Sequence, residues 1–121
     1  MTTLAQRRAA LAAAIVAQGI PVPDSWGQQQ PPYALVFGDS TDFRPSPGGV
    51  RWSFRVTGVV AKATDQMATS AMDAMSWALT VAAWGLAGFT VDGLGAAAVR
   101  DIAGALHYTV DLSVSTTVDF A

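Results

Sequence analysis

The feature that most constrains the fold is a run near the C-terminus, His107–Val118, in which apolar and polar residues alternate. Alternation with a period of two over this length predicts a β-strand with one buried side and one solvent-facing side. A shorter run, Arg51–Thr57, repeats the pattern, with Trp52, Phe54 and Val56 on its apolar side. The two runs therefore predict a sheet that is buried on one face.

Two other stretches carry apolar residues at helical spacing. The first, Leu4–Gln18, is rich in alanine and follows an N-cap residue, Thr2 or Thr3. A longer helix is expected to start after an N-cap at Thr64 and to run to about Trp84. It is apolar around much of its circumference, so it can bury one side on the sheet and the other against a different surface. One apolar stripe consists of Met67, Ala71, Met75, Ala78 and Ala82, and the other consists of Trp77, Val81 and Trp84.

A short strand and a loop are expected before the Arg51 run. Tyr33–Phe37 is apolar and lies between prolines and a Gly-Asp pair, which is typical of a short strand. Asp39–Gly49 is rich in turn-forming residues and is expected to be a loop between this strand and the next. Gly58 is expected to form a bulge or kink within the strand that begins at Arg51.

Two further strands complete the expected order of elements. They are Phe89–Val91 and Ala98–Ile102, with a turn at Asp92-Gly93 between them. The order predicts a single α+β domain over residues 1–121, because nothing in the sequence resembles a linker or a repeat. We expect an N-terminal helix and an antiparallel or mixed sheet of four to five strands, with one long central helix packed on it.

Charged residues are scarce in this chain. They make up 13% of it, against about 25% in an ordinary soluble domain, while 51% of the residues are hydrophobic. Such a surface predicts that other copies or partners cover part of it, so we expect obligate assembly. The net charge of −2 gives no basic footprint for sequence-specific nucleic-acid binding.

Two segments resemble membrane or targeting sequences. Ala74–Val91 has no charged residue, but alanine, serine, threonine and glycine dominate it and no lysine or arginine lies close by, so a helix running into a strand fits better. Arg7 and Arg8 followed by Ala9–Ala17 resemble the charged and apolar regions of a short signal peptide. We favour an N-terminal helix for this segment.

The sequence holds little that indicates catalysis. Its one histidine is His107, and Asp111 follows on the same strand face at roughly 13 Å, too far to share a proton. An acid–base pair would have to form across strands, and Asp101 is near in sequence. The chain has no cysteine, and its aspartates lack the spacing of zinc or calcium sites. We expect no catalytic residue, no cofactor and no metal.

Several residues are candidates for contacts with other subunits, because aromatic and arginine side chains are enriched at interfaces. Trp26 is alone in a proline-rich connector and packs either on its own core or on a neighbour. Phe43 and Arg44 lie in the expected loop, where they either contact a neighbouring subunit or are exposed to solvent. Arg51 and Arg55 share the polar side of their strand. They form either a positive row or a solvated surface with salt bridges. The candidate interface residues are Trp26, Phe43, Arg44, Arg51, Arg55, Trp77 and Trp84.

The expected order of elements has six parts. They are an alanine-rich opening helix, a proline-rich entry to a short strand, a loose loop, an alternating strand, a capped helix that begins near Thr64 and a long alternating C-terminal strand. This layout resembles the tail terminator proteins of long-tailed bacteriophages, over nearly the whole chain. Related small head-to-tail joining proteins share much of it.

The resemblance implies a structural protein of the virion tail or neck, assembled in the cytoplasm of a bacterial host. Such proteins form a ring, commonly of six copies, that caps the growing tail tube and later meets the head-completion proteins. It implies neither catalysis nor a membrane, although the ring leaves room for DNA to pass through.

Other readings stay open. The nearest is another head–tail connector or a minor tail protein. A small oligomeric α+β enzyme or ligand-binding protein would instead use His107 with Asp111 or Asp101 at a subunit boundary, beside a concave pocket. A secreted cell-surface module would require removal of the first residues.

Overall fold

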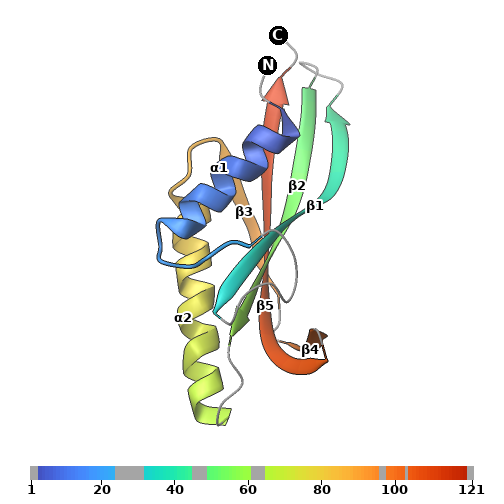
Figure 1. Ribbon diagram of the computed structural model, residues 1–121. Helices are drawn as coiled ribbons and strands as arrows, with labels where there is room; N and C mark the ends of the chain where they lie inside the picture. Colours follow the sequence, from blue (N-terminus) through green and yellow to red (C-terminus); the bar gives the residue numbers. More distant parts are fainter. Residues whose placement is uncertain are drawn as a thin grey trace.

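Two helices lie on the same face of a five-stranded antiparallel sheet in the computed structural model (Figure 1). The structure describes residues 3–23, 32–44, 49–60, 65–95, 98–102 and 104–119. The elements in chain order are α1 (Leu4–Val16), β1 (Tyr33–Arg44), β2 (Gly49–Val60), α2 (Asp65–Trp84), β3 (Phe89–Leu94), β4 (Ala98–Ile102) and β5 (Ala105–Asp119). The predicted α+β class is confirmed, although two helices share the sheet face rather than one central helix.

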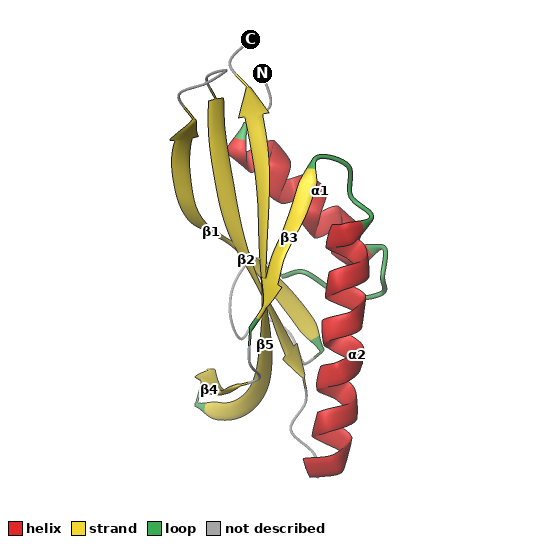
Figure 2. Cartoon of the chain, turned by 180° about the vertical axis from the view of Figure 1, so that it is seen from behind, coloured by secondary structure: helices red, strands yellow, loops and turns green. Residues whose placement is uncertain are grey.

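The C-terminal strand β5 organises the sheet. The strand order is β1-β2-β5-β3, and β4 pairs with β5 beyond this path. β2 and β5 pair without interruption from Gly49 opposite Asp119 to Val60 opposite Tyr108. The β4–β5 hairpin curls away from the helices (Figures 1 and 2). The long alternating run at the C-terminus therefore supplies the partner for β2, β3 and β4, as its length allows.

Local signals place both ends of α1. Thr3 is its N-cap: the Thr3 hydroxyl accepts a hydrogen bond from the Gln6 amide, and the Gln6 side chain accepts one from the Thr3 amide. This reciprocal arrangement satisfies two amides that a helix start otherwise leaves unpaired. Gly19, with a φ of 83°, follows the last turn in the left-handed region that favours glycine. Leu11 and Ile15 lie one turn apart and are both buried.

The main core lies between the helices and one sheet face. α2 contacts β2, β3 and β5, whereas α1 contacts α2 and β1. Met75 and Leu79 of α2 pack on Phe54 of β2 and Leu112 of β5 within one cluster of buried side chains. The opposite face of the sheet is not simply solvated: Tyr33, Leu35 and Val59 form a second cluster, and the polar Thr57 and Thr109 are buried. The expected half-buried sheet is thus also buried over part of its polar face.

The structure corrects the predicted loop between the first two strands. β1 continues to Arg44 and pairs with β2 as far as Gly49, so Phe43 and Arg44 lie in a strand opposite Val50 and Gly49. A bulge between Gly38 and Ser40 shifts the register and lets the pairing go on. Polar, turn-forming residues such as those at 39–42 predict a loop locally, but pairing with a long partner strand outweighs this preference.

Two glycines also have different roles from those predicted. Gly58 does not form a bulge, since it pairs in regular register with Ala34 and Val110. A side chain there would meet Met75 and Leu79, so Gly58 instead lets α2 approach the sheet closely. The predicted turn at Asp92-Gly93 is wrong as well, because both residues belong to β3, where the register shifts between Val91 and Gly93.

Candidate interaction surfaces

A row of exposed apolar side chains runs along the solvent side of α2. Trp77 and Trp84 are 72% and 75% exposed, and Val81 between them is 37% exposed. Their spacing places them on one face of the helix, opposite Met75 and Leu79 in the core. We call Trp77, Val81 and Trp84 the tryptophan stripe. Tryptophan is enriched at the centres of protein interfaces, so the stripe is a candidate contact surface.

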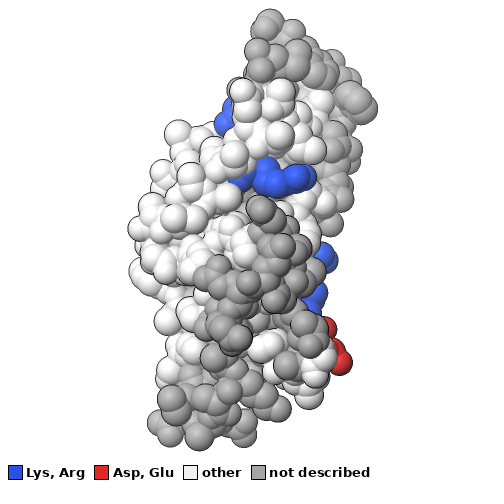
Figure 3. Space-filling model, viewed as in Figure 1, with Lys and Arg blue, Asp and Glu red and all other residues white. Residues whose placement is uncertain are grey.

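The surface around the helices carries few charges. In the view of Figure 3 the blue and red side chains form a few isolated patches, and the other described residues are white. Within α2, Asp73 is the one charged residue from Gln66 to Trp84, and it is exposed. It precedes Trp77 by one helical turn, so it lies on the same face as the tryptophan stripe.

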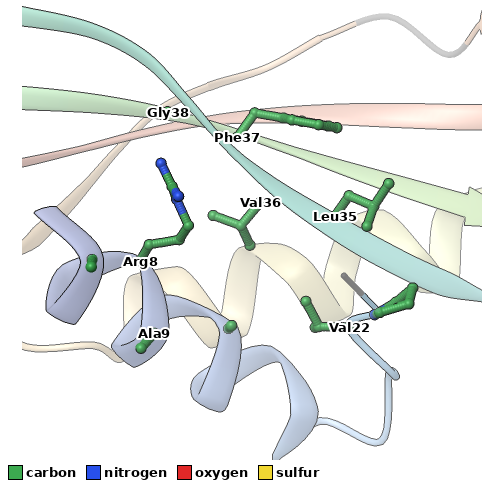
Figure 4. Close-up of a pocket in the computed structure, with 10 residues that line it drawn as sticks. Arg8, Ala9, Val22, Leu35, Val36, Phe37 and Gly38 are labelled. Carbon is green, nitrogen blue, oxygen red and sulfur yellow. The ribbon is translucent and has the colours of Figure 1, made fainter. Parts of the chain in front are cut away.

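A pocket of about 530 Å³ lies between α1 and β1 (Figure 4). Its helix wall is made of alanines, whose small side chains leave the space open, and its far wall is the first half of β1. We call it the α1–β1 pocket. Its lining residues are Ala5, Arg8, Ala9, Ala12, Val22, Pro23, Leu35, Val36, Phe37 and Gly38.

Neighbouring arginines of α1 reach different parts of the sheet. Figure 4 shows the Arg8 side chain directed toward Gly38 and Phe37 of β1, and a Cβ at Gly38 would lie 3.0 Å from Arg8 Nη2. Arg7 instead places its guanidinium carbon 5.8 Å from the ring centroid of Phe89 in β3, a cation–π contact. Arg7 therefore holds the helix onto the sheet, while Arg8 supplies the positive charge of the pocket.

Among the described residues, the polar face of the sheet carries two ion pairs. Arg51 Nη2 lies 3.2 Å from Asp92 Oδ1, and the same carboxylate oxygen accepts a hydrogen bond from the Ser115 hydroxyl. Arg55 stacks on Phe37, with 5.3 Å from its guanidinium carbon to the ring centroid. Arg51 and Arg55 thus share one face, as predicted. Arg51 forms a salt bridge, which agrees with the alternative of a solvated, salt-bridged surface.

A second polar group lies farther along the same face. Arg100 Nη2 donates to Asp111 Oδ2 at 2.9 Å, and the buried Thr57 hydroxyl donates to Asp111 Oδ1 at 2.6 Å. Both oxygens of Asp111 are thereby engaged by residues other than His107. Asp101 is engaged too, because its Oδ1 accepts from the Gly104 amide.

These contacts bear on the hypothesis that His107 acts together with Asp111 or Asp101 in an enzyme or a ligand-binding site. His107 is paired in the β4–β5 ladder opposite Arg100, and the α1–β1 pocket is not lined by it. Within the described part of the chain, no cluster of histidine and acidic residues is arranged to hold a metal ion. The geometry therefore places His107 in a hairpin, with Asp101 and Asp111 committed to other partners.

The predicted interface residues fall into three groups. Trp77 and Trp84 lie together on the solvent side of α2, and Arg51 and Arg55 lie together on the polar sheet face. Phe43 and Arg44 are in β1 rather than in a loop, and Trp26 lies outside the described residues. Sequence reasoning missed Arg8 and the pocket, for which the available signal was an arginine pair in an otherwise alanine-rich helix.

Comparison with protein-family models and with curated proteins found no match. No protein-family model matches the chain, and no curated protein matches it in sequence. Among the described residues, neither helix has the length and apolar character needed to span a membrane.

Proposed function

We propose that the protein is a structural subunit of a ring that caps the tail tube of a long-tailed bacteriophage and joins it to the head-completion proteins. The observation that carries the proposal is the tryptophan stripe, exposed on a chain in which only 13% of the residues are charged. The layout of helices and strands supports the phage setting. The protein would then belong to the virion tail or neck, after assembly in the host cytoplasm.

The free energy of covering the stripe is large for so small a chain. A tryptophan presents roughly 150–250 Å², of which about three-quarters is exposed at Trp77 and Trp84. At about 25 cal/mol per Å², burial of each side chain is worth about 3–5 kcal/mol. This exceeds what a solvated surface residue contributes and favours a permanent assembly over a free monomer.

The polar sheet face suits a different position in such a ring. Its arginines are held by Asp92 and by Phe37, so the face presents a fixed pattern of charge and hydroxyl groups rather than an apolar patch. We assign it to the lumen or to the contact with an adjoining ring, where the tail tube protein or DNA would lie. No sequence-specific reading of DNA is proposed.

Electron microscopy of the purified protein tests the proposal. The expected image is a ring with a central hole, formed of identical copies. In the virus that encodes the chain, loss of the gene should give tails of uncontrolled length, because an uncapped tube continues to grow. Compact particles without a hole, together with tails of normal length after gene loss, would contradict the proposal.

A further inference from the structure

We propose that one copy of the chain binds the next by placing Trp77 of its tryptophan stripe in the α1–β1 pocket of the neighbour. The partner is therefore a second copy of this chain. The inference takes its setting, a ring of identical copies, from the proposed function, and it specifies which two surfaces meet.

The two surfaces are different and lie on different parts of the molecule. The tryptophan stripe is on α2, which contacts β2, β3 and β5 and presents the stripe away from the sheet. The pocket lies against β1, which is at the other end of the strand order from β3. A contact between unlike surfaces is head-to-tail, so it repeats from copy to copy and closes into a ring where the rotation allows.

The pocket is large enough for an indole side chain. Its volume of about 530 Å³ falls within the range of roughly 300–1,000 Å³ that is typical of sites for small organic groups. Alanines at positions 5, 9 and 12 keep the helix wall low, and apolar residues of β1 form the other wall. Burial of a flat aromatic ring against such walls is the arrangement found at the centres of strong interfaces.

The charges of the two surfaces are complementary. Arg8 is the one charged side chain among the described residues that line the pocket. On the other surface, Asp73 is the one charged residue of α2 from Gln66 to Trp84, about 6 Å along the helix axis from Trp77 at 1.5 Å per residue. With Trp77 in the pocket, Asp73 comes within reach of the Arg8 guanidinium, and that guanidinium also meets the face of the indole ring.

Two variants that each disable one surface test this arrangement. Trp77→Ser removes the anchor from an exposed position, and Ala9→Phe fills the pocket from an exposed position of α1. Each variant alone should weaken self-association by roughly 30-fold or more, the loss typical of a central anchor residue. An equimolar mixture should form a 1:1 dimer and nothing larger, because only one competent stripe and one competent pocket remain. Leu106→Ser, which removes another half-exposed apolar side chain, is the control and should leave the assembly intact.

Charge reversal provides a second and independent test. Arg8→Asp and Asp73→Arg should each weaken assembly by roughly tenfold, whereas the double variant should restore it, because the pair is re-formed with opposite signs. Circular dichroism on each variant should show an unchanged fold, since both side chains are exposed.

The outcomes separate this inference from the proposed function. Loss of assembly in Trp77→Ser but not in Ala9→Phe, with no 1:1 dimer on mixing, would overturn the inference, because the stripe would then pair with itself or with another protein. Rings that persist in all variants would overturn it and leave the proposed function standing. Recovery by mixing and by double reversal, in an assembly that is a dimer or filament instead of a ring, would support the inference and contradict the proposed function.

Discussion

Replacing Gly58 by alanine should destabilise the protein, although alanine is the better residue in an ordinary strand. Gly58 lies near the C-terminal end of β2, paired on both sides and buried beneath α2. A methyl group there would overlap Cγ of Met75 and would lie 2.8 Å from its Sδ and 3.1 Å from Cδ1 of Leu79. Both of these side chains are themselves buried.

The expected magnitude follows from two opposing terms. Overpacking of a buried site typically costs about 1–3 kcal/mol, while replacement of glycine by alanine inside a strand recovers about 0.5–1 kcal/mol of backbone entropy. With overpacking at the middle of its range, about 2 kcal/mol, the net loss of unfolding free energy should be about 1–1.5 kcal/mol. For a domain of this size the loss corresponds to a fall in Tm of about 4–6 °C.

Thermal and urea unfolding followed by circular dichroism, at one fixed protein concentration, measures the effect. Gly93→Ala is the matched control, because Gly93 is also in a strand but a Cβ there meets nothing within 4 Å. In a Met75→Ala background the Gly58→Ala change should become nearly neutral, which gives a coupling of about 1 kcal/mol or more. A Tm that rises on Gly58→Ala, or a loss unaffected by Met75→Ala, would refute the close packing of α2 on β2.

The remaining predictions concern single contacts. Thr3→Ala removes one half of the capping box and should lower stability by about 1 kcal/mol, measured by urea unfolding; an unchanged midpoint would mean that the cap contributes nothing. Asp111→Ala leaves the buried Thr57 hydroxyl without its acceptor and should cost about 1–3 kcal/mol, whereas Asp92→Ala, which breaks the half-exposed pair with Arg51, should cost at most about 1 kcal/mol; equal losses would contradict this ranking. His107→Ala should leave the oligomer mass unchanged and alter no function other than through packing, and loss of a turnover or of ligand binding would favour the enzyme alternative. The tryptophan fluorescence of dilute wild-type protein should shift to shorter wavelength as assembly covers Trp77 and Trp84, and a spectrum independent of concentration over the assembly range would contradict burial of the stripe.

Periodic patterns predicted much of this fold. The β5 alternation, the Arg51 strand, the Ala98–Ile102 strand and the approximate extents of α1 and α2 are all local signals, and the structure has each of these elements. The N-cap predicted at Thr64 lies outside the described residues. The tryptophan stripe could also be predicted from the sequence, because helical spacing alone separates Trp77 and Trp84 from the core side of α2.

Features that depend on contacts between segments far apart in the sequence could not be predicted. The residues at 39–44 favour a turn until β2 is available to pair with them, and Gly58 resembles a bulge until α2 lies against it. The α1–β1 pocket needs two elements far apart in the chain, so its volume has no signature in the sequence, and the arginine pair of α1 does not by itself assign Arg8 to a pocket. Local physics thus fixes the elements, while the candidate site arises from how they pack.

Native mass spectrometry of the wild-type protein over a series of concentrations tests the central claim most directly, namely that identical copies cover the exposed apolar surface. We expect one closed assembly, whose mass is a whole-number multiple of the 12.5 kDa chain and stays constant as the concentration rises. A monomer that persists at the highest concentration the solution supports would contradict the claim.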